Sequence, residues 1–344
     1  MAKSSKRALG KTTPFFSYDK KAVLEAVGKK RLLHNLRQML LIRHFEVRGE
    51  SAYQQGKVGG FYHSYMGQEA IQVAAVEAMG VDNWWATSYR CHALALLLDV
   101  PPNELMAELY GKATGNAMGR GGSMHFFASN LLGGGGIVGG QIPLATGAGF
   151  AIKYRKEKGK VSVCFLGDGA VAQGSFHESL NIAALWSLPV VYVVEENMWG
   201  MGTATKRAIA ADHISKDHAM AYGIDYYDFD GMDYFCCYAG FKEVFDKVEK
   251  RGRPVLIGCH TQRFRGHSIS DPALYRPKEE LKELICGDPI TLLRETLMAE
   301  DLLTKEQYSA MDKEEKESVL SAMKYAEESP FPDPATLEED VFAP

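Results

Sequence analysis

The residues best suited to chemistry stand where two apolar runs of the sequence end. Asp168 lies between two glycines directly after the run 161–166, and Asn197 comes shortly after the run 190–194. Ligands of parallel α/β sheets bind at the carboxyl ends of the strands, so Asp168 and Asn197 are expected to share one edge of such a sheet. Their side-chain oxygens suit Mg²⁺, which keeps few protein ligands and takes phosphate oxygens for the rest. The pattern therefore predicts a site for Mg²⁺ and a diphosphate.

The two glycines beside Asp168 fit this interpretation. Gly167 and Gly169 allow the backbone to turn sharply and to approach a ligand closely. A Gly-Asp-Gly sequence alone is usually only a turn, but an asparagine one strand–helix–strand unit later makes the pattern more specific. No GxGxxG motif follows an early strand, and no P-loop occurs in a suitable context. This disfavours an NAD-dependent Rossmann oxidoreductase.

The elements that position these residues follow from hydrophobic spacing. Three continuously apolar runs, typical of buried parallel strands, cover residues 161–166, 190–194 and 255–259. Helical spacing is found in residues 20–55, 67–79, 141–156 and 176–186, in a short segment from Pro101, and from 278 onward. The predicted fold class is α/β, with a mostly parallel sheet flanked by helices and helical extensions at both ends. The expected domain covers residues 19–329, between a flexible arm (1–18) and a Pro-rich tail (330–344).

The composition excludes several classes of protein. The chain has 344 residues, and 46% of them are hydrophobic, which allows a large core. A net charge of −4 gives no electrostatic case for binding nucleic acid or an anionic membrane. The sequence has no run of about 18 uncharged apolar residues, so no transmembrane helix is predicted. The six cysteines show no CxxC pair or zinc spacing, and the basic N-terminus lacks an apolar core. We therefore expect a cytoplasmic, bacterial-type protein rather than one of an organellar matrix.

Longer blocks of sequence resemble the alpha subunits of thiamine-diphosphate-dependent 2-oxo acid dehydrogenases. The central block is GDGAVAQGSFHESLNIAALWSLPVVYVV, followed by ENMWGMGT. Further matching blocks are GGFYHSYMGQEA, TSYRCHA, GRGGSMHFF, GGGGIVGGQIPLATG, FDGMD and RFRGHSISDP. They extend from about residue 30 to the FPDP near the end of the chain. The resemblance implies the thiamine-diphosphate-binding fold and oxidative decarboxylation of a 2-oxo acid, with pyruvate as the expected substrate.

The same resemblance implies roles for individual residues. Mg²⁺ would be held by Asp168, Asn197 and the main-chain oxygen of Trp199. His63 and His267 would reach the substrate end of the cofactor and transfer protons. The diphosphate would be bound by Tyr89 and Arg90 and by the backbone of Gly169 and Ala170. Gly136 and Val138 would support the cofactor through their backbone. Three further histidines are expected to be structural or exposed: His92, His125 and His177.

The substrate and the competing functions depend on a few residues. Phe61 places a large ring beside His63, which should shorten the acyl pocket and disfavour branched-chain 2-oxo acids. The block GGQIPLATG favours the pyruvate type over the acetoin type. These sister activities remain the alternatives within the family. The alternative of another class is a non-catalytic scaffold subunit, and four intact residues oppose it: Arg90, Asp168, Asn197 and His267.

The resemblance also implies protein partners. A beta subunit would complete an α2β2 heterotetramer with cofactors at the alpha–beta interfaces, and a lipoyl acyltransferase would accept the acetyl group. The recognisable motifs all serve the diphosphate or the substrate, and one domain covers nearly the whole chain. We therefore expect the chain alone to be inactive. The small-residue helix 141–150 and the glycine-rich loop before it (residues 111–140) are suited to a close subunit contact.

Three positions depart from the family pattern, and one of them is Arg265, which stands where some relatives carry another histidine. Glu196 stands where an asparagine is usual, and Trp199 replaces a usual tyrosine. An unpaired carboxylate beside a phosphate would oppose cofactor binding. Glu196 is therefore expected to point away from the diphosphate or to pair with a cation such as Lys206 or Arg207. Ser268 matches a regulatory phosphorylation position of mitochondrial relatives.

Overall fold

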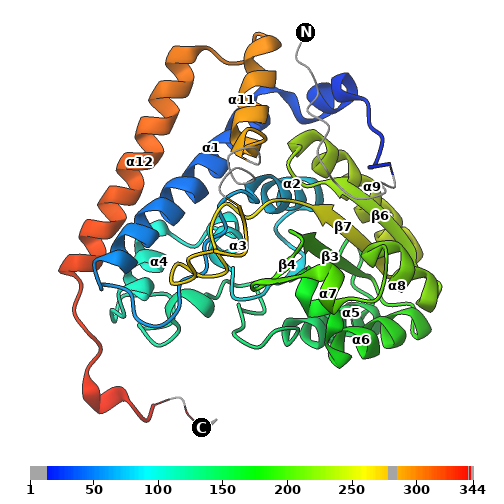
Figure 1. Ribbon diagram of the computed structural model, residues 1–344, viewed down its shortest axis with the longest axis horizontal. Coiled ribbons are helices and arrows are strands. Elements are labelled where there is room, and N and C mark those ends of the chain that lie inside the picture. Colours follow the sequence, from blue (N-terminus) through cyan, green and yellow to red (C-terminus); the bar gives the residue numbers. More distant parts are fainter. Residues whose placement is uncertain (1–13, 278–284, 340, 342–344) are drawn as a thin grey trace.

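The fold is organised by a five-stranded parallel sheet. The computed structural model describes residues 14–277, 285–339 and 341. In spatial order the strands are β1 (Trp84–Ala86), β2 (Ser162–Gly167), β3 (Val190–Glu196), β7 (Val255–His260) and β6 (Asp225–Asp230). All four pairings are parallel. Strands β3, β6 and β7 are labelled in the right half of Figure 1. A separate antiparallel hairpin consists of β4 (Trp199–Gly200) and β5 (Thr203–Ala204).

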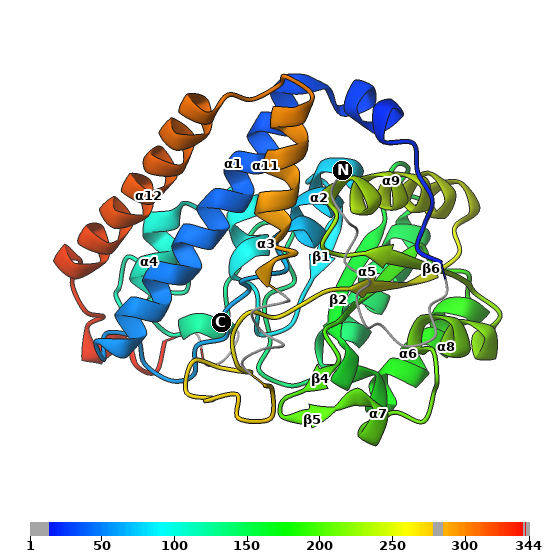
Figure 2. The same ribbon diagram turned by 45° about the horizontal axis from the view of Figure 1, so that its top comes forward.

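Helices cover both faces of the sheet (Figure 2). One face packs against α5 (Gln141–Arg155), α6 (Gly174–Leu185) and α8 (Ile214–Tyr222). The other face lies under α2 (Glu69–Met79), α3 (His92–Leu97) and α9 (Tyr234–Arg251). Strand side chains alternate between the two layers: Tyr192 and Val194 belong to the first core, Val191 and Val193 to the second. Burial on both faces explains why these strands are continuously apolar.

The helical extensions pack along one another beside the sheet layers. Helix α1 (Lys20–Gln54) begins at Asp19, whose side chain accepts hydrogen bonds from two backbone N–H groups. Gly28 has a φ of 76° and kinks the helix near its start. Helices α11 (Pro289–Ala299) and α12 (Lys305–Glu328) pack against α1, and α12 also covers α4 (Pro102–Leu109) (Figure 1). The structure thus confirms the α/β class, the parallel sheet and the terminal helical extensions. The short helix α7 (Thr205–Ala208) follows β5.

The two ends of the chain partly contact the core. Phe16 N donates a hydrogen bond to the carbonyl of Asp228 (2.7 Å), and the Tyr18 hydroxyl donates to Asp233 (2.5 Å). The described part of the expected arm, residues 14–18, is therefore packed against β6 and α9, and residues 1–13 lie outside the described residues. In the tail, Pro330 accepts a hydrogen bond from Ala113 N before a short turn at Pro334–Thr336. Among the described helices none is long and apolar enough to span a membrane.

Candidate active site

Asp168 lies at the end of β2, beside the end of β3. The strand register pairs Gly167 with Glu195, so Asp168 and Asn197 lie at neighbouring strand ends, as the sequence predicts. Asp168 is only 1% exposed; its Oδ1 accepts from Gly169 N (2.9 Å), while Oδ2 is buried without a hydrogen-bond partner. Burial raises the pKa of Asp168 to about 6, although nearby N–H groups oppose this shift. The free oxygen is suited to accept a cation.

The loop after β3 folds back over the Gly-Asp-Gly turn. The buried Asn197 accepts a hydrogen bond from Trp199 N (3.2 Å) through Oδ1, and Met198 between them has a φ of 70°. A Cβ built on Gly169 would lie 3.1 Å from the Cα of Gly200 in β4. The turn and the β4–β5 hairpin are therefore in backbone contact, and glycine is what permits it. Asn197 and the main chain of Trp199 follow the strand end next to that of Asp168.

Three aromatic rings from distant parts of the sequence form a second part of the site. The ring centroids of His63 and Tyr89 are 4.4 Å apart, and those of His63 and His267 are 5.0 Å apart. Tyr89 and His267 complete the triangle at 5.5 Å. Phe61 lies 6.3 Å from His63 and is 60% exposed. The structure thus brings together Phe61, His63 and His267, which were expected around the substrate end of a cofactor. Tyr89, which was expected to bind the diphosphate, lies against the same two histidines.

Arg90 connects the loops that carry the two histidines. Its guanidinium donates to the carbonyl of Ser64 (2.6 Å) and to the carbonyl of His267 (2.6 Å). The side chain is buried, and this burial, together with the charge of Arg263, lowers the pKa of Arg90 to about 10. Arg90 was expected to bind a diphosphate; here it fixes the relative position of the His63 and His267 loops. Both are roles for a rigid, planar multi-donor group.

The local electrostatics keep both histidines neutral. Burial, followed by the charges of Arg90 and His267, lowers the pKa of His63 to about 3. Burial and the charges of Arg90 and Arg263 lower the pKa of His267 to about 4. The Arg263 guanidinium joins the two parts of the site, because it donates to the carbonyl of Met201 beside the β4–β5 hairpin (3.3 Å) and to the carbonyl of Arg265 (3.1 Å), two residues before His267. The Nδ1 of His63 is buried and has no hydrogen-bond partner.

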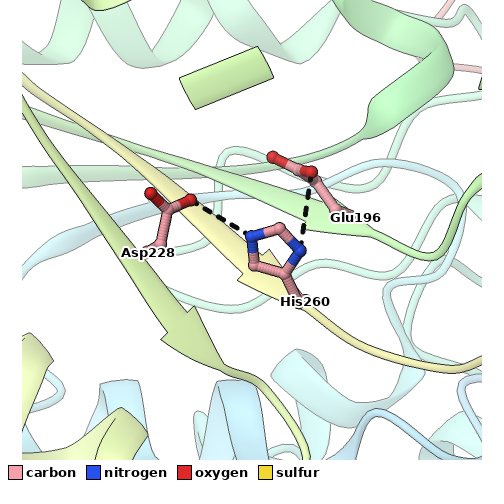
Figure 3. A group of neighbouring side chains, drawn as sticks. All are labelled: Glu196, Asp228 and His260. Carbon is pink, nitrogen blue, oxygen red and sulfur yellow. Dashed lines mark hydrogen bonds and ion pairs between the residues drawn. The ribbon is translucent and has the colours of Figure 1, made fainter. Parts of the chain in front are cut away.

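The two glutamates that end β3 point to opposite faces of the sheet. Glu195 accepts hydrogen bonds from the Tyr65 hydroxyl and from Gln72 (3.4 Å) on the α2 side. Glu196 lies on the α8 side, where its Oε2 is 3.8 Å from Nδ1 of His260 (Figure 3). Lys206 and Arg207, named as possible partners, are exposed, and the neighbour of Glu196 is instead the imidazole of His260 from β7.

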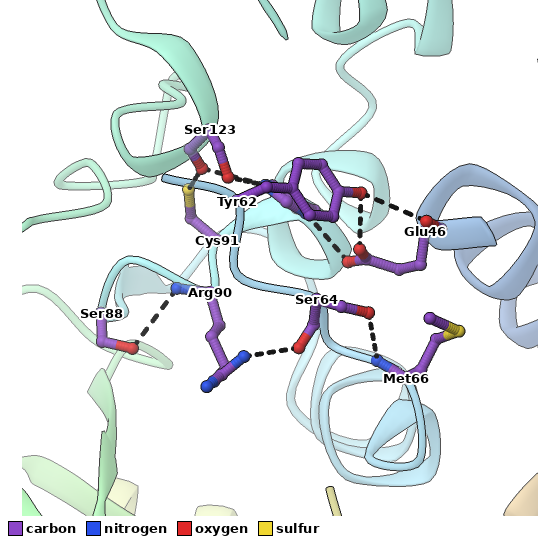
Figure 4. Close-up of polar contacts among 9 residues, drawn as sticks. Glu46, Tyr62, Ser64, Met66, Ser88, Arg90, Cys91 and Ser123 are labelled. Carbon is purple, nitrogen blue, oxygen red and sulfur yellow. Dashed lines mark hydrogen bonds and ion pairs between the residues drawn. The ribbon is translucent and has the colours of Figure 1, made fainter. Parts of the chain in front are cut away.

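A buried glutamate on α1 links three loops of the site (Figure 4). Glu46 accepts from the Tyr62 hydroxyl (2.7 Å) and is bonded to His92 Nδ1 (2.9 Å). The other ring nitrogen of His92 lies 2.8 Å from the Ser123 hydroxyl. All four side chains are buried. Tyr62 precedes His63, so Glu46 and His92 together hold the loop of His63, the segment after Arg90 and the middle of the glycine-rich loop in one arrangement.

A second buried glutamate orders the glycine-rich loop. Glu108 on α4 accepts four backbone N–H bonds at 2.6 to 3.1 Å, from Ala117, Gly119, Gly121 and Gly122. A Cβ on Gly115 would lie 2.4 Å from Glu108 Oε2, so the loop wraps closely around the carboxylate. Further along the same loop, Gly136 and Val138 are exposed in this chain.

Sequence reasoning missed Glu46 and Glu108 as organisers of the site. Each lies on a helix face whose other members are apolar and buried, such as Ile42 and Phe45 beside Glu46. A charged residue at a core position of an amphipathic helix is the signal that could have revealed both. The role expected for His92 as structural agrees with its buried position. Ser268 is buried, and its hydroxyl lies 2.9 Å from that of Ser270.

Comparison with known proteins agrees with this geometry. Residues 37–335 match the family model "Dehydrogenase E1 component". The chain belongs to this family. It is 40% identical over 318 residues to the pyruvate dehydrogenase E1 component subunit alpha of Rickettsia felis, covering 91% of this chain and 96% of that protein. The protein of the same name from Rhizobium meliloti is also 40% identical, with 91% and 90% covered. A mitochondrial type I alpha subunit from Ascaris suum is 40% identical, with 87% and 75% covered.

Proposed function

We propose that this chain is the alpha subunit of a pyruvate dehydrogenase that uses thiamine diphosphate and Mg²⁺. The observation that carries the proposal is the buried Asp168 carboxylate, which has one oxygen without a partner at the strand end next to Asn197. The names of the E1 relatives support pyruvate as the substrate. When bound, thiamine diphosphate supplies the carbon nucleophile and the electron sink that decarboxylation of a 2-oxo acid requires.

The residues around the strand ends fit a Mg²⁺-diphosphate group. Asp168 and Asn197 offer oxygen ligands, and the main-chain oxygen of Trp199 would be a third, which leaves positions for phosphate oxygens. Gly169 and Ala170 belong to the same turn, and their backbone would contact the diphosphate. A bound cation would satisfy Asp168 Oδ2, which is buried without a hydrogen bond. Tyr89 and Arg90 would contact the diphosphate, and Gly136 and Val138 would support the cofactor.

His63 and His267 are proposed to handle protons at the substrate. Their depressed pKa values, about 3 and about 4, keep both imidazoles neutral near pH 7. A neutral imidazole can accept a proton or donate an N–H, which proton transfer at a keto oxygen or carboxylate requires. Arg90 holds both loops by their carbonyls, so it positions the two rings relative to each other. Phe61 would close the acyl side of the pocket and favour pyruvate over branched-chain 2-oxo acids.

An exposed apolar face is proposed as the contact with a beta subunit. The side chains that form it are Leu144, Phe150 and Tyr154 on α5 and Leu185 and Trp186 at the end of α6; each is 46 to 78% exposed. Phe150 stacks on Tyr154 at 5.9 Å and contacts Trp186 at 5.7 Å. Exposed aromatic groups that contact one another, as Phe150, Tyr154 and Trp186 do, are typical of a protein interface. The assembly would be an α2β2 heterotetramer, which passes the acetyl group to a lipoyl acyltransferase.

The proposal is tested by assaying pyruvate decarboxylation with thiamine diphosphate and Mg²⁺, first with this chain alone and then with its beta subunit. We expect activity only with both subunits, and its loss in an Asp168→Ala variant of the reconstituted enzyme. Acetoin and 2-oxoisovalerate serve as competing substrates. Full turnover by the chain alone would refute the division of labour between subunits, and preference for another substrate would refute the pyruvate assignment.

A further inference from the structure

A second group of carboxylates and imidazoles lies on the α8 side of the sheet. Glu196, Asp228 and His260 each offer one ligand atom, and these atoms lie within 4.8 Å of one another (Figure 3). The strand register explains the grouping, because Glu196 pairs with His260 and Asp228 pairs with Gly258, two residues earlier on the same face. A Cβ on Gly258 would lie 2.7 Å from both an Asp228 and a Glu196 oxygen. The glycine therefore leaves space that the two carboxylates occupy.

The hydrogen-bonding capacity of this group is not filled. Glu196 is buried, with only 7% of its surface exposed, and its Oε1 has no hydrogen-bond partner. Its Oε2 is 3.8 Å from His260, which is an ion-pair distance but too long for a hydrogen bond. Asp228 Oδ1 accepts from Ser215 Oγ (2.8 Å) and contacts His260 Nε2 (3.1 Å), while Oδ2 has no hydrogen bond. Two buried carboxylates with unused oxygens thus converge on one imidazole, a costly arrangement without a further cation.

We propose that Glu196, Asp228 and His260 form a binding site for a divalent transition-metal ion. One imidazole nitrogen and two carboxylate oxygens suit Zn²⁺, Co²⁺, Mn²⁺ or Fe²⁺, whereas Mg²⁺ and Ca²⁺ prefer oxygen ligands alone. Bonds of about 2.1 Å place tetrahedral ligands about 3.4 Å apart, so Glu196 would move toward the other two on binding. A fourth position would remain for water.

Two further residues contact the proposed ligands: His213 lies beside Asp228, and Phe15 lies against His260. His213 accepts from Lys216 N at the start of α8, which directs its Nε2 toward Asp228 Oδ2 at 3.5 Å. Such a partner orients a ligating carboxylate. On the other side, the Phe15 ring lies 5.2 Å from the His260 ring. The His260 side chain is still 19% exposed, so an ion can exchange.

This site is distinct from the proposed magnesium site, and its existence does not depend on the proposed function. The carboxylate at 196 replaces the asparagine usual in the resembled family, and it immediately precedes Asn197. A cation bound by Glu196 would neutralise a charge that otherwise repels a diphosphate. The competing arrangement is a protonated His260 between the carboxylates. Although burial opposes it, the hydrogen bond to Asp228 and the charge of Glu196 raise the pKa of His260.

The test is a titration of the full-length chain with Co²⁺, followed by visible d–d absorption, in excess Mg²⁺ and without thiamine diphosphate. We expect a saturable band that Zn²⁺ removes by competition. His260→Phe and Asp228→Asn should each weaken Co²⁺ binding at least about tenfold, because loss of an outer-shell partner alone typically costs 10–100-fold. His177→Phe and Asp168→Asn should leave the titration unchanged. His177 is a control because it lies beside His218, another place where imidazoles gather.

Further measurements protect the test against misfolded variants. Glu196→Asn restores the residue usual in the family, so it should keep the fold and still weaken Co²⁺ binding at least about tenfold. Zn²⁺ should raise the melting temperature of the wild-type chain but not of this variant. Absence of a Co²⁺ band in the wild type would overturn the proposal. A band unchanged in both His260→Phe and Glu196→Asn, or one lost in Asp168→Asn, would overturn it as well.

Discussion

Replacing Tyr62 by phenylalanine tests whether the buried Glu46 network holds the His63 loop. The change removes one hydroxyl that donates to Glu46 Oε2 at 2.7 Å, in a place where both side chains are completely buried. A hydrogen bond to a charged group contributes about 1.5–3 kcal/mol, so the free energy of unfolding should fall by that amount. For 344 residues the unfolding entropy is about 0.7 kcal/mol/K near 60 °C, which converts the loss to about 2–4 °C in Tm.

The assay combines urea unfolding with steady-state kinetics of the reconstituted enzyme. The urea midpoint should fall with an unchanged slope. Turnover should fall several-fold at saturating cofactor, because Tyr62 adjoins His63 and a loosened loop misplaces the ring. Tyr53→Phe is the matched control: its ring lies 6.4 Å from that of Tyr62, and its hydroxyl makes no hydrogen bond within the described residues.

A double-mutant cycle separates the hydrogen bond from other effects of the substitution. Glu46→Gln replaces the carboxylate by a neutral group of the same shape. In this background the cost of Tyr62→Phe should drop to the about 0.5–1.5 kcal/mol of a neutral hydrogen bond. An equal cost in both backgrounds would show that the hydroxyl is not bonded to Glu46. Wild-type stability and turnover of Tyr62→Phe would refute the positioning role outright.

Three further predictions concern the cofactor, the substrate and pH. Asp168→Ala removes a charged ligand, so calorimetry should show thiamine diphosphate with Mg²⁺ binding at least about tenfold more weakly; wild-type affinity would contradict the metal assignment. Phe61→Ser should shift preference from pyruvate toward 2-oxoisovalerate by about tenfold, and an unchanged ratio would remove Phe61 from the pocket. The folded-state pKa values of His63 and His267, about 3 and 4, lie below the unfolded value of about 6.5. Their contribution to stability is therefore complete above pH 6.5 and is lost as pH falls toward 3; a His63→Asn/His267→Asn double variant should lose less stability than the wild type between pH 7 and 4.

The sequence predicts the central strands well and the edge strands poorly. Strands β2, β3 and β7 are buried on both faces, and their continuous apolar runs reveal them. Strand β6 lies at an edge of the sheet and has the sequence DYYDFD. It lacks the continuous apolar run of a strand buried on both faces, so its composition does not reveal it. Strand β1 has three residues, too few for any period to be recognised.

The candidate site divides in the same way. The meeting of Asp168 and Asn197 follows from strand order alone, because neighbouring parallel strands end at one edge. The partner of Glu196 cannot be predicted in this way. His260 lies 64 positions further along the chain, and only the pairing of β3 with β7 brings it opposite Glu196. Lys206 and Arg207 are nearer in the sequence, but closeness in sequence does not predict which side chain lies opposite a given residue in a sheet. The position of Arg90 between two loops likewise depends on carbonyls that are distant in the sequence.

The way the site loops are fixed follows from their composition. A loop with few apolar side chains cannot be held by hydrophobic burial, so its position must come from directional bonds. Three buried charged groups provide them: Glu108 holds four N–H groups of the glycine-rich loop, Glu46 holds Tyr62 and His92, and Arg90 holds two carbonyls. Glycine at position 115 is required because any Cβ would collide with the Glu108 carboxylate. The glycine-rich composition is thus the consequence of wrapping a loop around a buried anion, and the loop need not be flexible to be rich in glycine.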